Sequence, residues 1–408
     1  MAQRAGGGTD VAVPGYAPTM KIFHTSDWHI GRTFHTHPTL DHFRIVAQAM
    51  AQLVVTEHVD VVVVAGDIFD SAMPAADAYT VLSDTLRALR SAGAQVVLTS
   101  GNHDSATRLG FQSEWARHAG IHVMTHHERL DTPVVIDDEH GPVHFFGIPY
   151  LEPALIRHSY PDVSLSTHEQ ALSFAMRRIL SHLETHPARS VVLAHCFAAS
   201  VRAEVDVDGP ERDITAGGLN LVAASVFDGP DYVALGHIHG RSEISERVRY
   251  SGAPLHYSFS EANKARGGWM VTLDAVGLGS VVWHDLPVPR PLAEISGTLE
   301  HLLTAAEFAA VEEHWVKANL TDRVRPFDAM RLVQSRFGHC VALEYRPPTA
   351  DGSPQITYSE RTAKQTDAEI VAGFVEYVRN GVGPTAFESR LLAELLIESP
   401  ASTRGGRA

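Results

Sequence analysis

Four short polar motifs follow stretches that we predict to be strands, and a fifth predicted strand ends on a histidine. The motifs read SDWH, GDIFD, GNHD and GHIH, and the fifth strand reads SVVLAH. In α/β proteins, sites form at the C-terminal ends of the strands. Helix capping explains one or two polar strand ends, but it does not call for histidine. We therefore expect the five strand ends to meet in one site.

Taken singly, most of these motifs also have a structural explanation. A D-x-H pair can be loop polarity, a G-D pair after a strand can be a turn, and GNHD can be a type I′ or type II turn. The GHIH motif is more specific, because a spacing of two places both imidazoles on the same side of an extended segment. The combination of all five strand ends is what indicates a site.

The candidate metal ligands comprise two carboxylates, one amide oxygen and four imidazoles, with no thiolate. They are Asp27, His29, Asp67, Asn102, His195, His237 and His239. Seven ligands exceed the four of one tetrahedral zinc ion and suit two ions that share a bridging carboxylate. Mixed nitrogen and oxygen ligands favour manganese, iron or zinc over magnesium and calcium, which prefer oxygen. Two ions about 3.5–4 Å apart can hold both ends of an in-line displacement at phosphorus and lower the pKa of a bridging water.

Two further residues of the GNHD motif are candidates for catalysis rather than for metal binding. His103 follows Asn102, so its ring can lie near the ions without binding them. An alkoxide leaving group needs a proton or a cationic neighbour, and His103 is our candidate for that role. Asp104 could hold the ring of His103 and raise its pKa. The alternatives are an ordinary surface-loop histidine and an aspartate that stabilises a turn.

The elements that must position these residues alternate from Met20 onward. Strands are expected at residues 21–24, 60–65 and 95–99, and helices at 41–58 and 76–91. Further strands are expected at residues 134–136, 143–148, 190–194, 231–235, 248–250, 269–273 and 280–284, with a helix at 168–183. The run DVVVVA is typical of a strand that is buried on both faces. The order indicates an α/β core with two stacked sheets and covering helices.

A proline-rich stretch, LPVPRPL at residues 286–292, marks a stiff linker. After it we expect a small α+β unit with a helix at residues 305–318 and strands at 330–334 and 339–345. Thr366 and Glu369 form the capping box of an amphipathic helix, and a second apolar stripe begins at Phe387. These two helices either pack on their own domain or dock a partner, and the sequence leaves both alternatives open.

Composition limits the class of protein. The 408 residues allow two or three domains, and 44% apolar residues are enough for a core. Two cysteines, Cys196 and Cys340, exclude a disulfide-stapled secreted fold and fit a reducing compartment, so we expect a cytoplasmic protein. No stretch approaches the roughly 20 apolar residues of a membrane span, so we expect no membrane partner.

The formal charge of −15 bears on nucleic-acid binding. DNA-binding proteins usually carry a basic footprint. Binding of DNA to this chain would therefore depend on the metal ions, on a partner and on local basic residues. The candidates are Arg32, Arg108, Lys264 and Arg266, each of which can equally be an ordinary surface charge.

The string HTSDWHIGR, followed by GDIFD, GNHDS and GHIH, resembles the calcineurin-like metallophosphoesterase superfamily. Within it, the chain is most similar to a branch of bacterial nucleases that repair DNA double-strand breaks. The resemblance runs from about residue 20 to at least residue 283, and YSGAPLHYSFSE at residues 250–261 resembles the family segment after the metal ligands. It implies an α/β fold in which a two-sheet β-sandwich is flanked by helices, followed by a small α+β capping domain and C-terminal helices.

The resemblance also implies boundaries and roles. We expect residues 1–19 to be a flexible tail, 20–286 the metallophosphoesterase nuclease domain, 291–350 the capping domain and 365–400 the partner-binding helices. The family pattern gives one ion to Asp27, His29, Asp67 and His239, and the second to the bridging Asp67 with Asn102, His195 and His237. Manganese is the usual family ion, and His103 matches the catalytic histidine of the family.

The implied activity is hydrolysis of DNA, as an exonuclease on duplex ends and an endonuclease on single strands or hairpins, in repair, recombination and replication. The implied partners are DNA and an ABC-type ATPase whose coiled-coil base docks the C-terminal helices, with a homodimer of this chain inside a heterotetramer. The dimer surface would use residues near 76–90 and 108–118.

Two other functions compete with this interpretation. One is a phosphodiesterase for small nucleotides, phosphate esters or phosphoproteins, and the other is a scaffold that retains the fold without activity. Phosphoprotein members of the family usually carry different second and third motifs, and the extension after Pro291 disfavours a compact small-molecule enzyme. The presence of every expected ligand disfavours an inactive scaffold.

Overall fold

The computed structural model describes residues 19–199, 221–348, 366–379 and 382–398. The contacts divide the chain into two compact units, residues 1–289 and residues 290–408. The expected N-terminal tail, residues 1–19, lies outside the described residues except for Thr19. In the parts of the chain that the structure describes, no helix is long and apolar enough to cross a membrane.

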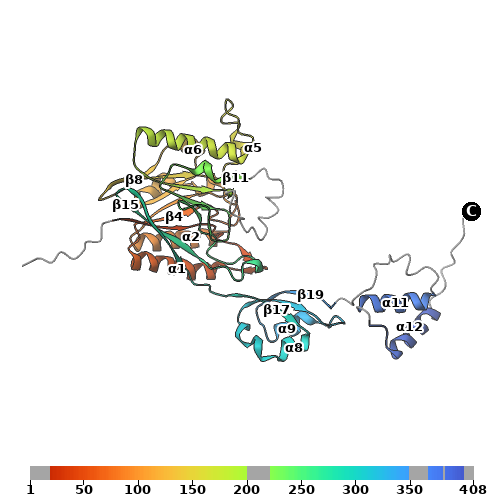
Figure 1. The fold of residues 1–408 in the computed structure, drawn as a ribbon. Helices are drawn as coiled ribbons and strands as arrows, with labels where there is room; N and C mark the ends of the chain where they lie inside the picture. Colours follow the sequence, from red (N-terminus) through yellow and green to blue (C-terminus); the bar gives the residue numbers. More distant parts are fainter. Residues whose placement is uncertain (1–18, 200–220, 349–365, 380–381, 399–408) are drawn as a thin grey trace, which may run out of the picture. The chain divides into compact units, whose positions relative to one another are not determined.

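Two six-stranded sheets form the centre of the first unit (Figure 1). The first has the order β16 (Gly277–Asp285), β15 (Gly267–Asp274), β1 (Met20–Thr25), β4 (Val61–Ala65), β5 (Gln95–Thr99) and β6 (Ile121–Met124). The second has the order β13 (Ser242–Glu243), β14 (Val248–Tyr250), β12 (Tyr232–Gly236), β9 (Arg189–His195), β8 (Gly141–Ile148) and β7 (Val134–Asp138). Within each sheet the central strands are parallel, so their carboxyl ends lie along one edge.

Strand β4 shows why the two sheets stack. All five of its residues are buried. Val62 and Val64 pack with the helices on the outer face, whereas Val61, Val63 and Ala65 pack with residues of the second sheet. Because successive side chains of a strand point to opposite faces, an uninterrupted apolar run requires cover on both sides.

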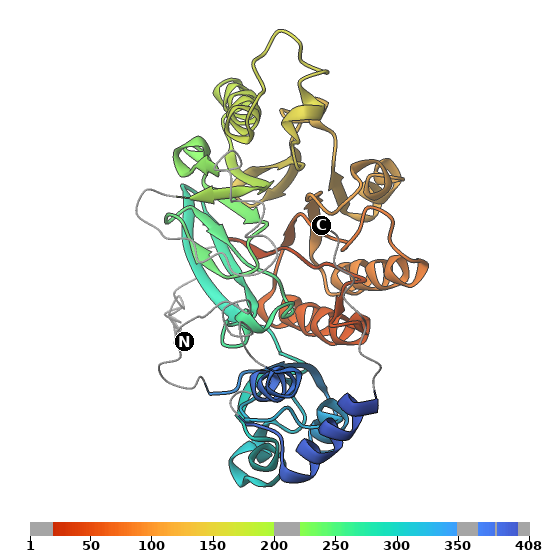
Figure 2. The same cartoon turned by 90° about the vertical axis from the view of Figure 1, so that its right-hand side faces the viewer.

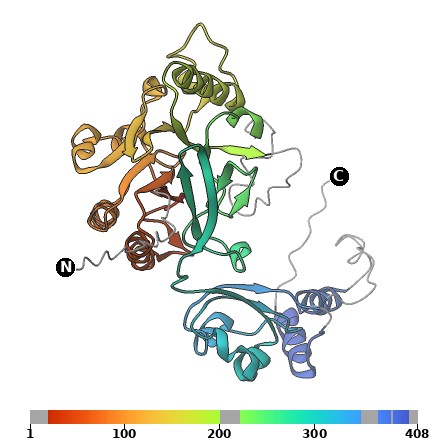
Figure 3. The same cartoon turned by 60° about the vertical axis from the view of Figure 1, so that its left-hand side comes forward.

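Helices cover the outer face of each sheet (Figures 2 and 3). Helices α1 (Leu40–Glu57) and α2 (Ala76–Ser91) cover the first sheet, and α6 (His168–Thr185) covers the second. Phe43, Val46, Met50 and Val54 form the buried face of α1, at the spacing of one helical stripe. The shorter elements are β2 (Thr33–Phe34), β3 (His37–Pro38), α3 (Ala106–Leu109), α4 (Ser113–Ala116), η1 (Arg117–Ala119), η2 (His127–Arg129), α5 (Pro153–Ile156), β10 (Phe197–Ala199), β11 (Leu221–Ala223), η3 (Ala224–Phe227) and η4 (Phe259–Glu261).

The second unit contains a three-stranded parallel sheet, β17 (Leu292–Gly297), β18 (Trp315–Leu320) and β19 (Cys340–Tyr345). Helices α8 (Leu299–Thr304) and α9 (Ala329–Gln334) and the 3-10 segment η5 (Ala306–Val311) connect these strands. Leu302, Val316, Val333 and Phe337 are fully buried in its core.

Two sequence-based expectations for this unit are wrong. The expected helix at residues 305–318 is a 3-10 segment followed by β18, because pairing with strands on both sides outweighs the helix propensity of its alanines. The expected strand at 330–334 lies in α9, which buries Ala329 and Val333 one helical turn apart. Predicted strands and helices of the first unit are confirmed, and their ends shift by at most three residues.

The two predicted C-terminal helices are confirmed as α11 (Asp367–Val378) and α12 (Ala386–Glu398). The Thr366 hydroxyl accepts from the Glu369 amide at 3.3 Å, and the Glu369 carboxylate accepts from the Thr366 amide at 2.7 Å, which is the predicted capping box. Thr385 and Glu388 cap α12 in the same way.

A partly buried ion pair ties the edge of the second sheet together and predicts how stability depends on pH. Arg189 Nη1 donates to Asp138 Oδ2 at 2.8 Å, and the two side chains are 8% and 16% exposed. The hydrogen bond from Arg189 lowers the pKa of Asp138. A carboxyl whose pKa is lowered by folding stabilises the protein above its unfolded pKa of about 3.9, and this stabilisation is lost as pH falls through the folded pKa.

We expect Asp138→Asn to lower the free energy of unfolding of the first unit by about 1.5–3 kcal/mol at pH 7, because it weakens a charge-assisted hydrogen bond. The difference from wild type should shrink as the pH is lowered below about 4. Urea unfolding of both proteins at a series of pH values measures this. A difference that grows toward acid pH would contradict the prediction.

Candidate metal centre

The structure brings all seven predicted ligands to one edge of the two sheets. Asp27 and His29 follow β1, Asp67 follows β4 and Asn102 follows β5, whereas His195 ends β9 and His237 and His239 follow β12. The six Asp and His residues are at most 6% exposed, and Asn102 is half-buried. Carboxylates and imidazoles gathered at this depth without bulk solvent require compensating charge or hydrogen bonds.

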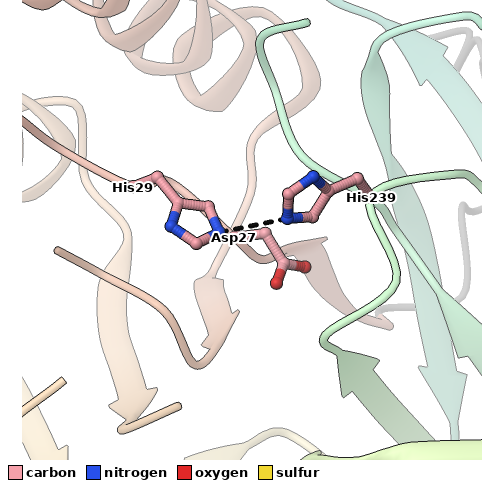
Figure 4. A group of neighbouring side chains, drawn as sticks. All are labelled: Asp27, His29 and His239. Carbon is pink, nitrogen blue, oxygen red and sulfur yellow. Dashed lines mark hydrogen bonds between the residues drawn. The ribbon is translucent and has the colours of Figure 1, made fainter. Parts of the chain in front are cut away.

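One group of ligand atoms comes from Asp27, His29 and His239, whose side chains point toward one another (Figure 4). Nε2 of His29 lies 3.1 Å from Nε2 of His239. A second group comes from Asp27, Asp67 and His195. Within each group the ligand atoms lie within 4.8 Å of one another, which leaves room for an ion between them.

Asp67 lies between the two groups. Its Oδ2 is 3.5 Å from Nε2 of His29 and 3.4 Å from Nε2 of His195. Asn102 joins the second group, because its Oδ1 is 2.9 Å from Nε2 of His195 and 3.1 Å from Nδ1 of His237. The position of Asp67 therefore suits the bridging role that the resemblance implies.

The hydrogen bonds of His195 show that this cluster fits a cation. Nδ1 of His195 donates to the carbonyl oxygen of Ala65 at 2.9 Å, so a neutral ring presents a lone pair at Nε2. That lone pair faces Oδ1 of Asn102 and Oδ2 of Asp67, which are acceptors as well. Three converging lone pairs repel one another unless a positive charge lies among them.

Burial and neighbouring charges shift the pKa values of the clustered side chains. Burial alone would lower the pKa of His195, but the negative charge of Asp67 raises it to about 9. Burial raises the pKa of Asp27 to about 6 and lowers the pKa of His29 to about 4. Burial and the charge of His195 lower the pKa of His237 to about 3. The negative charge of Asp67 thus favours a positive charge beside it in the cluster.

Four of the predicted ligands have left-handed backbone conformations. Asp27, His29, Asp67 and His237 have φ between +42° and +104°. Non-glycine residues in this region cost of order 1–3 kcal/mol each, and such strain gathers at functional sites. Backbone hydrogen bonds between the first two motifs hold the conformation, from the Asp27 amide to Gly66 O and from the His29 amide to Asp67 O, both at 3.0 Å.

The glycine of the GNHD motif, Gly101, is required because the carboxylate of Asp67 lies too close to it to leave space for a side chain. A Cβ at Gly101 would lie 2.1 Å from Oδ1 of Asp67. Any side chain at this position would displace the carboxylate that lies between the two ligand groups. The motif therefore carries glycine for the geometry of the site, and the turn that it forms is part of that geometry.

His103 lies at the edge of the cluster, where one of its ring nitrogens is within 4.8 Å of ligand atoms of His29 and Asp67. Its ring centroid is 4.8 Å from that of His29, and its side chain is only partly buried. Nδ1 of His103 donates to the carbonyl oxygen of Asp70 at 2.9 Å. The remaining nitrogen, Nε2, is then the one that can exchange a proton with a substrate.

The expectation that Asp104 holds the ring of His103 is wrong. The carboxylate of Asp104 instead accepts backbone N–H groups from Ile68 at 3.0 Å, Phe69 at 2.9 Å and Gly101 at 2.9 Å. Burial raises its pKa to about 7. Asp104 therefore joins the GDIFD and GNHD loops and is a loop-positioning residue without contact to the ring that it was expected to orient.

The structure also corrects one candidate DNA contact and adds a residue that the sequence analysis did not assign. Arg266 is 2% exposed and its Nη2 donates to Glu261 Oε2 at 2.6 Å, so it cannot reach DNA.

Glu261, also 2% exposed, places Oε1 3.4 Å from Nδ1 of His239. Hydrogen bonding to His239 and the charge of Arg266 outweigh burial and lower the pKa of Glu261 to about 2. The glutamate ends the segment YSGAPLHYSFSE, and this resemblance was the only sequence signal for it.

Comparison with known families gives the class of protein. The family model described as calcineurin-like phosphoesterase matches residues 20–241, which is more than half of the chain. A second model, described as the Type 5 capsule protein repressor C-terminal domain (SbcD_C), matches residues 288–378. The chain belongs to the calcineurin-like phosphoesterase family, and it has the metallophosphoesterase fold predicted from the sequence.

Similar solved structures include TT1561 of Thermus thermophilus, with 13% identity over 66% of this chain and 99% of that one and a TM-score of 0.37. They also include a dimetal phosphatase from Danio rerio, with 15% identity, coverage of 66% and 100%, and a TM-score of 0.38. GAP50, the anchor in the inner membrane complex of Plasmodium, is 11% identical, with coverage of 67% and 90% and a TM-score of 0.35.

Proposed function

We propose that this chain is the nuclease subunit, SbcD, of an SbcCD-type complex that hydrolyses DNA phosphodiesters in repair and recombination. The observation that carries the proposal is the combination of the cluster formed by the seven predicted ligands with a C-terminal region similar to the SbcD_C family. The proposed substrates are duplex ends, for exonuclease cleavage, and single strands or hairpins, for endonuclease cleavage.

The chain's own residues would hold two divalent ions, and we propose manganese. Asp27, His29 and His239 would bind one ion, Asn102, His195 and His237 the other, and Asp67 both. When bound, two such ions offset the charge of the scissile phosphate and lower the pKa of water. Mixed oxygen and nitrogen ligands favour manganese, iron or zinc over magnesium.

His103 would act as the general acid. Because its Nδ1 donates to Asp70 O, its Nε2 is available to protonate the oxygen that leaves when the P–O bond breaks. Arg32 is a weak candidate for a DNA contact, because its side chain is 15% exposed and Nη1 lies 3.6 Å from Asp70 Oδ1. Arg108 is exposed and donates to Ala72 O at 2.9 Å, which leaves its outer face toward solvent.

The proposed ATPase partner, of the SbcC type with a long coiled coil, would dock on α11 and α12. These helices expose large apolar side chains, among them Phe374 at 52%, Phe387 at 68% and Leu395 at 54%. A second copy of this chain would dock on residues near 76–90 and 108–118, and in the latter segment Phe111 and Trp115 are 75% and 76% exposed. Exposed apolar patches of this kind mark interaction surfaces. We propose that the resulting complex is a heterotetramer with two copies of each chain.

The experiment that tests the function is cleavage of linear duplex DNA by the full chain, co-expressed with the ATPase, with Mn²⁺ and with or without ATP. We expect cleavage of linear duplex and of hairpins, and a complex mass of two copies of each chain by light scattering. Phe387→Asp should abolish co-purification of the ATPase, whereas Val276→Asp, which alters a 91% exposed apolar residue in the first unit, should not. Intact duplex together with rapid cleavage of cyclic nucleotides would refute the proposal in favour of a small-molecule phosphodiesterase.

A further inference from the structure

A buried carboxylate lies directly behind one of the proposed metal ligands. Oε1 of Glu261 is 3.4 Å from Nδ1 of His239, and Nε2 of the same ring faces Nε2 of His29 at 3.1 Å. The other carboxylate oxygen, Oε2, accepts from the Tyr257 amide at 2.9 Å and from Arg266 Nη2 at 2.6 Å. The carboxylate is therefore fixed on one side while its other side faces the imidazole.

Arg266 links this carboxylate to the backbone of the same ligand. Its Nη1 donates to the carbonyl oxygen of His239 at 2.5 Å and to that of Ala253 at 3.2 Å. Glu261 and Arg266 thus contact both the ring and the main chain of His239. An ion pair that served stability alone would need neither contact with His239.

The chemistry of Glu261 and His239 determines which ring nitrogen of His239 carries the proton. An ionised carboxylate only accepts hydrogen bonds, so a neutral imidazole beside it carries its proton on Nδ1. Nε2 then bears a lone pair, which is the form in which histidine binds a metal ion. Carboxylates in this position fix the tautomer and orientation of ligating histidines and raise their basicity.

A carboxylate also lies behind the ring of His29, but it is more exposed than Glu261. Its Nδ1 lies 3.3 Å from Oδ1 of Asp70, but that side chain is 33% exposed and its carboxylate is shared with Arg32 at 3.6 Å. Solvent and Arg32 therefore compete for Asp70. Glu261, at 2% exposure, is the stronger of the two carboxylates.

We infer that Glu261, held by Arg266, is a positioning residue of the metal centre that fixes His239 as the Nδ1–H tautomer and directs its Nε2 to the ion shared with Asp27 and His29. The inference rests on the proposed two-metal function, and it concerns metal affinity as well as catalysis.

The test compares Glu261→Gln with wild type in the full chain. Mn²⁺ affinities are measured by competition with a chelator, and the ring nitrogens of His239 are observed by ¹⁵N NMR in the metal-free protein. We expect one of the two ions to bind about 10–100-fold more weakly and the other within twofold of wild type. We also expect a mixture of His239 tautomers in the variant and the Nδ1–H form alone in wild type.

Asp138→Asn is the matched control, because it also removes a carboxylate that is paired with a buried arginine, Arg189, on a strand whose opposite end carries the site. It should lower stability and leave both metal affinities unchanged. If Glu261→Gln does not fold, Glu261→Gln combined with Arg266→Gln removes both charges and carries the same expectation.

Equal Mn²⁺ affinities in wild type and Glu261→Gln, with a single His239 tautomer in both, would overturn this inference and leave the proposed function intact. A wild-type chain that binds no divalent ion would overturn the proposed function and this inference together.

Discussion

Replacing His103 by alanine should lower kcat for DNA cleavage by about 100–10,000-fold and leave two bound ions per chain. General acids contribute about this factor. Its Nδ1 is already occupied by the carbonyl oxygen of Asp70, so the ring has one free nitrogen and a partly exposed position beside His29. Steady-state cleavage and metal analysis of the purified variant measure the two quantities.

A substrate with a good leaving group separates proton donation from other roles of His103. Bis-p-nitrophenyl phosphate releases a phenolate that needs no proton, so its hydrolysis should fall far less than DNA cleavage. His140→Ala is the control, because His140 lies in the turn before β8, at the far end of that strand from the site. An equal loss of activity on both substrates would contradict the general-acid role of His103. Fewer than two bound ions in His103→Ala would show instead that His103 is a metal ligand.

The meeting of the seven ligand residues could be predicted from the sequence because it follows from topology. Each residue stands directly after, or at the end of, a short apolar run, as Asp67 does after DVVVVA. When such runs form parallel strands, their carboxyl ends lie along one edge whatever the side chains between them. The prediction needed the order of the elements, and it did not need their exact bounds.

Contacts made by loops could not be predicted in the same way. Asp104 is adjacent to His103 in the chain, and proximity suggested that it orients that ring. In the folded protein it accepts amides from residues 68 and 69, which are brought near only by the pairing of β4 with β5. Glu261 likewise ends the short 3-10 helix η4, in a segment with no periodicity in its sequence, and only the folded chain places it beside His239.

The second unit shows a different limit. Residues 305–318 are rich in alanine, and local propensity favours a helix there. Trp315, Val316 and Ala318 are instead buried in a strand paired on both sides. Pairing of β18 with β17 and β19 determines that these residues form a strand, and the local sequence does not indicate this pairing.

Replacing Asp67 by asparagine should have the largest effect on the metal centre, because one carboxylate faces both ligand groups. Its Oδ2 lies 3.5 Å from Nε2 of His29 and 3.4 Å from Nε2 of His195, and its Oδ1 accepts the His103 amide at 2.8 Å. The amide keeps the shape but loses the negative charge. We expect fewer than two ions per chain and a loss of affinity beyond the roughly 100-fold limit typical of a residue that only supports a ligand.

This loss should extend to every substrate, which distinguishes Asp67 from His103. Without the second ion, the charge of the scissile phosphate is offset only in part, so hydrolysis of DNA and of bis-p-nitrophenyl phosphate should fall together. Asp138→Asn, which removes a carboxylate elsewhere, should keep both ions and both activities. Two tightly bound ions in Asp67→Asn would show that the carboxylate does not bridge them, and the assignment of ligands to the two ions would have to be redrawn around Asp27, the carboxylate that both groups contain.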